Sequence, residues 1–275
     1  MNQFTHKLYT LLERDSDNCH IQLADASHPL FQAHFKNNPI LPAFPVYNNP
    51  KSINKVVSEV LAYDIPLIVI DDGSQVPIGN IIESQNVTIV THKTNLGKGV
   101  ALRSGAQKAY ELGYHFCLTM DGDGQHFAED IPKFLDAFKA DDKQMIIGVR
   151  DFDNCNPPKS SSIGRLIGNF WVWIESGTWV KDTQTGFRLY PINFLHYNST
   201  ASRYEFEIEN LVNFLWGGGK ITEVVIKTVY GEDRVTHFDK IKDNLHMIVL
   251  HTILVIKRIF LLKGFIKKTE EGTSV

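Results

Sequence analysis

The chain has 275 residues, of which 43% are hydrophobic and 21% charged, with a formal net charge of −3. This length suits one large α/β domain with appendages. The slightly acidic balance and the lack of an RNA-binding motif argue against nucleic acid as a partner. Cys19, Cys117 and Cys155 are widely spaced and form no CxxC pair, so we expect reduced thiols rather than a disulfide framework or a metal site.

Segments with strand and helix periodicity alternate along the chain, which predicts a doubly wound, mostly parallel α/β sheet. Asn48 or Asn49 can cap a helix that has Pro50 at its first position and runs to about Ala62. The strands that follow are expected near residues 67–70, 87–90, 115–120 and 145–149, and the helices near 98–112 and 129–139. Residues 151–162, rich in Asn, Pro and Ser, are expected to form a loop.

One apolar segment ends in the sequence Asp-Gly-Asp-Gly-Gln, which begins at Asp121. A strand that ends there would place two carboxylates beyond the carboxyl edge of the sheet, where open α/β folds bind ligands. Asp121, Asp123 and Gln125 offer the oxygen ligands that suit Mg²⁺ or Mn²⁺. An EF-hand is excluded, because His126 and Pro132 stand where that calcium loop needs Gly and Glu. A plain acidic turn is the alternative.

A second apolar segment, residues 67–70, ends in Asp71 and Asp72, so the two acidic strand ends are expected to form two walls of one cleft. Between them lies the sequence Asn-Leu-Gly-Lys-Gly at residues 95–99, followed by a helix whose first N–H groups favour an anion. This loop matches neither the Walker sequence nor the dinucleotide fingerprint. We therefore expect a nucleotide-diphosphate site of another kind.

The second half of the chain contributes further candidates. A carboxylate at Asp182 can accept a proton from an attacking hydroxyl. Arg188 can pair in bidentate fashion with a phosphate oxygen. The alternative is a surface Asp and a structural Arg. Arg150, which follows the strand expected at residues 145–149, is another candidate phosphate ligand. The acidic residues of 204–209 are interpreted mainly as favouring a helix N-terminus.

Five motifs occur in the order typical of family 2 glycosyltransferases with the GT-A fold: Val-Tyr-Asn-Asn at 46–49, Asp-Asp-Gly-Ser at 71–74, Asn-Leu-Gly-Lys-Gly at 95–99, Asp-Gly-Asp-Gly-Gln at 121–125 and Thr-Gly-Phe-Arg at 185–188. Over residues 44–238 the chain resembles the branch that contains dolichol-phosphate mannosyltransferase. The resemblance implies an inverting, metal-dependent enzyme. Such an enzyme moves a sugar from a nucleotide-sugar donor of the UDP or GDP type to a lipid or polyprenyl-phosphate-type acceptor.

The resemblance also implies roles for individual residues. Mg²⁺ or Mn²⁺ held by Asp121, Asp123 and Gln125 would neutralise charge on the leaving nucleoside diphosphate. Asp71 or Asp72 would accept a hydrogen bond from the base or ribose. The residues expected to bind the nucleotide-sugar are Tyr47, Asn48, Asp71, Asp72, Asn95, Lys98, Asp121 and Arg150. The expected catalytic residues are Asp182 and Arg188, with Asp182 as general base for a hydroxyl acceptor and only a positioning group for an ionised phosphate.

Residues 239–275 are expected to form a C-terminal amphipathic helix. The strongly apolar stretch 247–265 is interrupted by His251, Lys257 and Arg258. A spanning helix needs about 20 largely uncharged residues, and each central cation costs about 2.5–3.5 kcal/mol on insertion. We expect instead an interfacial helix whose cations reach anionic headgroups. Because residues 1–14 lack a signal-peptide core, we expect a cytoplasmic protein, peripheral at the inner face of the cytoplasmic membrane. A helix packed on the domain is the alternative.

Residues 1–43 belong to a different pattern. Residues 27–42 resemble the active-site segment of hotdog-fold hydroxyacyl-carrier-protein dehydratases, with His34 at the catalytic position. The segment lacks that family's long central helix and is too short to bury a core, so we predict a vestige without dehydratase activity. Pro42 and Pro45 also interrupt the expected first strand. Either dehydratase-derived residues serve as that strand, or the strand is damaged.

Two other function classes stay open. A sugar nucleotidyltransferase would carry a Gly-rich signature with Arg and Lys at the first strand, which residues 46–50 lack. A catalytically impaired remnant would bind nucleotide or membrane without turnover.

Overall fold

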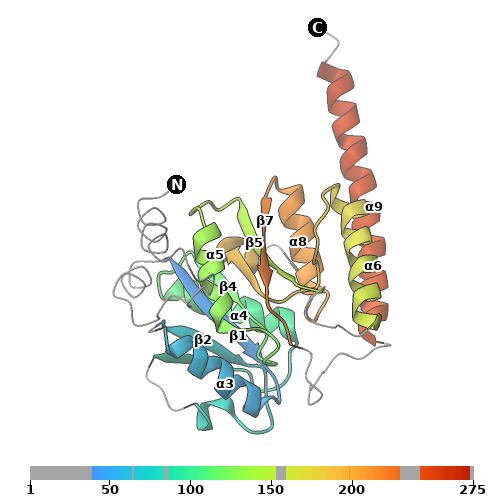
Figure 1. Cartoon of the computed structure of the whole chain (residues 1–275). Helices are drawn as coiled ribbons and strands as arrows, with labels where there is room; N and C mark the ends of the chain where they lie inside the picture. Colours follow the sequence, from blue (N-terminus) through green and yellow to red (C-terminus); the bar gives the residue numbers. More distant parts are fainter. Residues whose placement is uncertain are drawn as a thin grey trace, which may run out of the picture.

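The computed structural model describes residues 39–63, 65–82, 86–152, 159–197, 199–229 and 242–272 (Figure 1). The described residues form a seven-stranded sheet in the order β3-β2-β1-β4-β6-β5-β7. Its strands are β1 (Ile40–Val46), β2 (Leu67–Asp71), β3 (Val87–Thr91), β4 (Phe116–Thr119), β5 (Gln144–Arg150), β6 (Arg188–Pro191) and β7 (Lys220–Ile226). β6 runs antiparallel to β4 and β5, and the other pairings are parallel. The mostly parallel α/β prediction is confirmed.

β1 lies inside the sheet despite Pro42 and Pro45. Its residues 40–43 pair with β4, and its residues 43–46 pair with β2. A proline has no N–H to donate to a ladder. Because β1 pairs with each neighbouring strand over only part of its length, each of the two prolines can interrupt only one of the two ladders. The strand therefore forms from residues that include the end of the expected 1–43 segment, and it begins before the expected domain start at residue 44. The dehydratase-like residues 27–38 lie outside the described residues.

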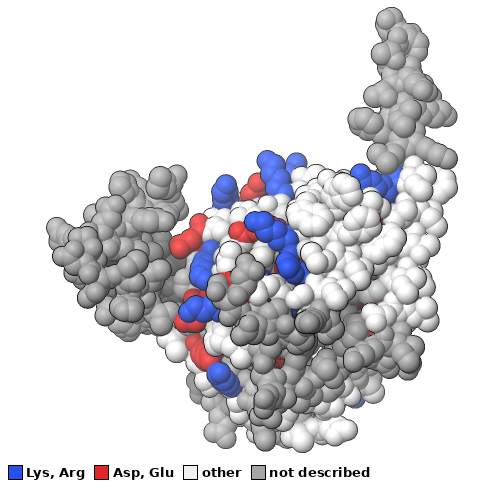
Figure 2. Space-filling view, turned by 45° about the vertical axis from the view of Figure 1, so that its right-hand side comes forward, with Lys and Arg blue, Asp and Glu red and all other residues white. Residues whose placement is uncertain are grey.

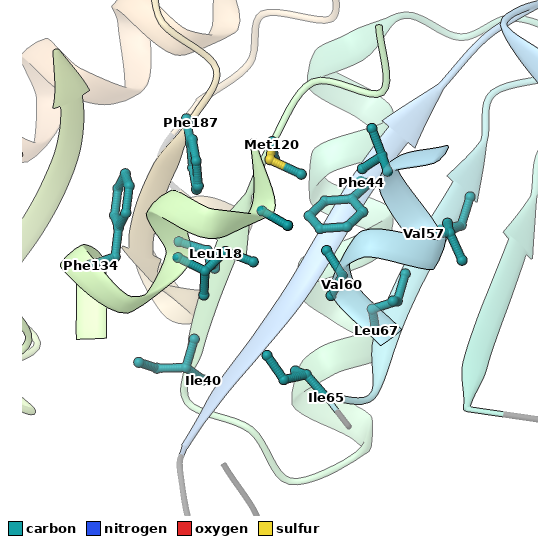
Figure 3. Close-up of a cluster of buried hydrophobic side chains, with 14 of the residues drawn as sticks. Ile40, Phe44, Val57, Val60, Ile65, Leu67, Leu118, Met120, Phe134 and Phe187 are labelled. Carbon is teal, nitrogen blue, oxygen red and sulfur yellow. The ribbon is translucent and has the colours of Figure 1, made fainter. Parts of the chain in front are cut away.

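Helices cover both faces of the sheet. α3 (Pro50–Leu61) and α5 (Ile131–Ala137), with the 3-10 turn η2 (Ala128–Asp130), share one apolar cluster with the strands. Figure 3 shows part of this cluster, in which Phe134 of α5 stacks on Phe187 with 4.3 Å between ring centroids. The opposite face carries α4 (Lys98–Glu111), α7 (Ile192–Tyr197) and α8 (Phe206–Trp216). A second 3-10 turn, η1 (Ile78–Asn80), follows β2.

α6 (Lys159–Ser176) and α9 (Lys242–Gly272) stand side by side at one edge of the molecule (Figure 1). Val172, Leu250 and Leu254 are buried between these helices and the domain. α6 begins inside the stretch 151–162, so the loop prediction is wrong for its last four residues, while residues 153–158 lie outside the description. Among the described residues, no helix combines the length and hydropathy that crossing a bilayer requires.

Candidate active site

A cavity of about 1310 Å³ lies beyond the carboxyl ends of β1 and β4. Tyr47 and Asn49 line it after β1, the segment 121–126 lines it after β4, and Lys98 lines it at the first turn of α4. Its volume exceeds the roughly 300–1,000 Å³ typical of a site for one small molecule. The cavity therefore gathers the acidic strand ends and the glycine-rich loop into one site, as the sequence predicts.

Lys98 connects two carboxylates at the centre of this cavity. Its Nζ lies 2.5 Å from Asp121 Oδ1 and 3.1 Å from Glu207 Oε2. Burial would lower the pKa of Lys98, but Asp121 and Glu207 outweigh burial and hold that pKa above its ordinary value. Burial raises the pKa of Glu207, and Lys98 and Arg188 offset only part of the rise. Glu207 Oε1 has no hydrogen-bond partner among the described residues, so this carboxylate does more at the site than favour the start of a helix, the role expected from the sequence.

Gly186 allows the carboxylate of Asp121 to sit where it does. A Cβ atom added at Gly186 would overlap the Asp121 side chain. Any larger residue at position 186 would displace the carboxylate. The glycine of the Thr-Gly-Phe-Arg motif therefore contributes to this site because it has no side chain.

Asp123 and Gln125 complete the acidic turn after β4. The backbone N–H of Gln125 donates to Asp123 Oδ1 over 3.0 Å, and Gln125 Nε2 donates to Asp123 Oδ2 over 2.7 Å. Within the described residues, no three His, Cys, Asp or Glu side chains gather as a metal site. The oxygens of Asp121, Asp123 and Gln125 nevertheless match in chemistry what Mg²⁺ and Mn²⁺ prefer.

His126 belongs to the site as well, although no role for it was expected from the sequence. It is 5% exposed, lines the cavity, and lies 5.6 Å from the ring centroid of Phe187. Burial lowers the pKa of His126 to about 4, although the charge of Asp121 opposes the shift. The imidazole is therefore neutral at pH 7. Its position directly after Gln125 is the only signal in the sequence that could have indicated it.

Asp72 holds the glycine-rich loop in place. Its carboxylate accepts hydrogen bonds from the N–H groups of Leu96 and Gly97 over 2.9 and 2.8 Å. Asn95 Nδ2 donates over 3.1 Å, and His92 Nδ1 lies at 2.7 Å. These four partners fill the acceptor positions that a carboxylate offers. The geometry therefore supports a loop-holding role for Asp72 rather than the expected contact with base or ribose.

Asp71 and Asn48 shape the wall beside Asp72. Asp71 accepts from the N–H groups of Ser74 and Ile78 over 2.9 and 3.0 Å. Asn48 Oδ1 accepts from the N–H of Gln75 over 2.8 Å, and the N–H of Asn48 donates to Ser74 Oγ. Both side chains thus close the turn after β2, whereas their neighbours Tyr47, Asn49 and Asp72 line the cavity.

The two residues expected to be catalytic, Asp182 and Arg188, are both buried and already have partners within the protein. Asp182 is fully buried and accepts from Arg150 Nε over 2.7 Å and Arg150 Nη2 over 2.8 Å. Arg188 is also fully buried, and its guanidinium donates to the carbonyl oxygens of Thr183, Thr185 and Glu207. This placement supports a structural role for Arg188 instead of the expected phosphate contact. Asp182 fixes Arg150, which lines the cavity.

Comparison with known proteins agrees with this geometry. The model of glycosyl transferase family 2 matches residues 43–203. The chain is 31% identical over 214 residues to the UDP-N-acetylglucosamine–dolichyl-phosphate N-acetylglucosaminyltransferase of Methanococcus voltae, covering 68% of this chain and 84% of that protein. It is 27% identical over 209 residues to the undecaprenyl-phosphate mannosyltransferase of Micrococcus luteus, covering 70% and 84% of the two chains.

A solved structure shares the fold. Glucosyl-3-phosphoglycerate synthase from Mycobacterium tuberculosis, in complex with Mn²⁺, UDP-glucose and phosphoglyceric acid, superposes with a TM-score of 0.58 at 17% identity, covering 83% of this chain and 82% of that one. The fold is of the GT-A type, and the family match and the relatives make the protein a glycosyltransferase. The chain belongs to glycosyl transferase family 2, in the dolichol-phosphate mannosyltransferase-like branch.

Proposed function

We propose that the protein moves a sugar from a UDP- or GDP-linked donor to a lipid or polyprenyl-phosphate-type acceptor, with Mg²⁺ or Mn²⁺ bound. One observation carries the proposal: a single cavity runs from the acidic turn after β4 to apolar side chains of α6 and α9. The relatives named above act on dolichyl and undecaprenyl phosphates, which combine an anion with an apolar chain. A cavity that is polar at one end and apolar at the other suits such an acceptor.

The polar end would take the donor. Asp121, Asp123 and Gln125 would hold the divalent ion, which when bound neutralises charge on the leaving diphosphate. Tyr47 and Asn95 line the cavity near the strand ends and would contact the nucleoside.

Two cations of the cavity wall are fixed by carboxylates. Asp182 orients the Arg150 guanidinium, and we propose that Arg150 contacts the diphosphate. Lys98 holds Asp121 and Glu207 together. If the acceptor carried a hydroxyl, Glu207 would be better placed than Asp182 to accept its proton, because Glu207 lines the cavity and Asp182 does not. A phosphate acceptor is already ionised and needs no base.

The outer faces of α6 and α9 would rest on the membrane. Large apolar side chains that do not line the cavity are exposed on both helices, at Leu166, Phe170 and Trp173 of α6 and at Leu245, Val249, Ile253, Ile256, Ile259 and Phe260 of α9. The right-hand side of Figure 2 is correspondingly almost free of charge. A contiguous apolar surface of this kind marks an interaction site. Lys257 and Arg258 on α9 would reach anionic headgroups at the inner face of the cytoplasmic membrane.

Calorimetric titration with UDP and GDP, each with and without Mn²⁺, tests the donor site. We expect metal-dependent binding of one nucleotide and its loss in Asp123→Ala. Asp142→Ala is a matched control, because Asp142 is exposed and away from the cavity. If the folded wild-type protein bound neither nucleotide, the result would contradict the proposed enzyme activity. It would favour the alternative that the protein is a catalytically impaired remnant.

A further inference from the structure

A backbone segment that precedes α8 covers the glycine-rich loop. The N–H of Gly99, in the first turn of α4, donates to the carbonyl oxygen of Ser202 over 2.8 Å. A Cβ atom added at Gly97 would overlap the same carbonyl oxygen, so the two surfaces touch closely. Lys98 lies between these glycines and pairs with Asp121. A shift of the segment before α8 would therefore move Lys98 at the site.

Arg203, the residue after Ser202, connects this segment to α9. Its Nε lies 3.0 Å from Oδ1 of Asp243, whose side chain is fully buried in the first turn of α9. Arg203 also lines the cavity, and its Cγ would lie 3.2 Å from a Cβ atom added at Gly97. The ion pair thus joins the start of α9 to the segment that rests on the glycine-rich loop.

The start of α9 contacts the domain at few points. From residue 243 to residue 249, Asp243 is the only buried residue, and the next buried residue is Leu250. Leu245 and Val249 are exposed and do not line the cavity, so they belong to the side that would rest on the membrane. The same two turns of α9 therefore offer apolar side chains to a membrane and one buried carboxylate to Arg203.

We propose that Arg203 and Asp243 are positioning residues through which α9 fixes Lys98 at the nucleotide site. The proposal rests on the proposed function and adds regulation to its donor site. When a membrane holds the outer side of α9, the first turn of the helix keeps Asp243 on Arg203. The segment before α8 then stays on the glycine-rich loop, and Lys98 stays beside Asp121, the expected metal ligand. In water the pair opens part of the time, and the open arrangement binds the donor less tightly.

Thermodynamic linkage gives this proposal a quantitative test. If a membrane surface raises the affinity for nucleotide by some factor, bound nucleotide must raise the affinity for the membrane by the same factor. UDP and GDP are titrated calorimetrically into the full-length protein with Mn²⁺ in excess, with and without vesicles of phosphatidylcholine and phosphatidylglycerol. Vesicle co-sedimentation with and without saturating nucleotide measures the reverse effect. We expect the two factors to agree and to be about fivefold or more, which is the lower end of typical coupling between sites.

Variants of the ion pair test whether it transmits the effect. Asp243→Asn removes one charge and Arg203→Met the other, and Arg203 is 36% exposed, so its replacement disturbs little packing. Each variant should bind nucleotide with the affinity that the wild type has without vesicles, and vesicles should no longer raise it. The double variant should lose nothing further, because both changes break one contact. Glu223→Gln is the matched control, since its ion pair with Lys181 lies outside the cavity.

Nucleotide affinity that is the same with and without bound vesicles would overturn the proposal and leave both the donor site and the membrane face standing. Coupling that survives in both single variants would overturn the role of the ion pair. If the folded wild type bound no nucleotide, the proposed function itself would fail. If it bound nucleotide but no vesicles, the membrane contact would fail, and the coupling with it.

Discussion

The carboxylate of Asp72 organises the turn that leads into α4. Four donors surround it, and two of them are backbone N–H groups of Leu96 and Gly97. His92 also extends this network to Ser104 of α4, since its Nε2 lies 2.9 Å from Ser104 Oγ. Because Lys98 directly follows the loop and pairs with Asp121, Asp72 determines the position of Lys98 without touching it.

Asp72→Asn should therefore weaken the fold and the nucleotide site together. The amide nitrogen would face a donor, and leaving a buried donor unsatisfied costs about 1–3 kcal/mol. Urea unfolding should show that loss, and UDP affinity should fall because the loop shifts. Asp142→Asn, at an exposed position, is the control. Unchanged stability in Asp72→Asn would contradict the loop-holding role.

Glu209 is a second buried carboxylate, at the base of α8. Burial would raise the pKa of Glu209, but hydrogen bonds from Ser199, Ala201 and Thr200 outweigh burial and hold that pKa below its ordinary value. A carboxylate with a lowered pKa stabilises the fold above the pKa it has in the unfolded chain, about 4.3. That stabilisation is lost as pH falls through the folded-state pKa.

Glu209→Gln should thus destabilise the protein at pH 7 by about 2 kcal/mol, in the range of hydrogen bonds to charged groups. The difference from the wild type should shrink as the pH is lowered below about 4.3. Denaturant unfolding at several pH values measures both quantities. Asp142→Asn, at an exposed position, should show neither effect. A pH-independent difference would mean that the ionised form of Glu209 is not what stabilises this region.

At single residues, the sequence predicts a location at the sheet edge more reliably than it predicts supporting contacts. Asp121 and Asp123 follow a strand directly, so their location at the sheet edge is a local consequence of the pattern. The partners of Asp72, Asp182 and Arg188 come from segments distant in the chain, and no local pattern specifies them. Burial decides their roles, because a buried charge must be paired.

Among the elements, the segment between α6 and β6 matters most for the site. Arg188 ties the carbonyls of Thr183 and Thr185 to that of Glu207 at the start of α8. Lys98, at the start of α4, reaches Glu207 as well. The starts of α4, α8 and β6 therefore meet around the Asp121 carboxylate.

Gly186→Ala tests how close this approach is. The added methyl group would overlap the Asp121 carboxylate, so we expect nucleotide binding with Mn²⁺ to weaken at least tenfold, a change of about 1.4 kcal/mol. Gly164→Ala is the control, because its Cβ would meet only Gln184 Oε1 at 3.9 Å, an ordinary contact in the same cavity. If both variants bound UDP like the wild type, the close approach of Gly186 would not position Asp121.

Most elements of the sheet domain could be predicted, because their apolar periodicity and length are strong local signals. The helix α6 was not predicted, and its start at Lys159 follows a stretch rich in Asn and Pro that resembles a loop. The strands β6 and β7 were not predicted either, and the antiparallel direction of β6 depends on pairing and not on sequence pattern. β1 forms despite two prolines because its neighbours on each side share the ladder.

For the whole molecule, the helices α6 and α9 have one side that lines the cavity and an outer side that does not. Phe170 and Trp173 of α6 and Ile253 of α9 are exposed and do not line the cavity. The expected peripheral contact with a membrane would use this outer side. Interfacial binding grows with the apolar area buried and with attraction to anionic lipids.

Trp173→Gln combined with Ile253→Gln should reduce binding to anionic vesicles about tenfold or more. The reason is that the double variant lacks two apolar side chains that would be buried in the membrane on binding. Vesicle co-sedimentation measures the change, and UDP titration on the same variant should match the wild type. Leu112→Gln, exposed at the end of α4, is the control for removing an apolar surface residue elsewhere. Equal sedimentation of all three proteins would contradict the membrane face.

The most direct test of the account is sugar transfer in vesicles that contain undecaprenyl phosphate, compared with vesicles that contain undecaprenol. Labelled UDP- and GDP-sugars are supplied with Mn²⁺, and the lipid fraction is examined for label. We expect label from one donor to enter the lipid only when the phosphate is present, and to be lost in Asp123→Ala. Transfer that is equal with both lipids, or no transfer from any donor by a protein that binds the nucleotide, would contradict a phosphate-linked lipid as acceptor.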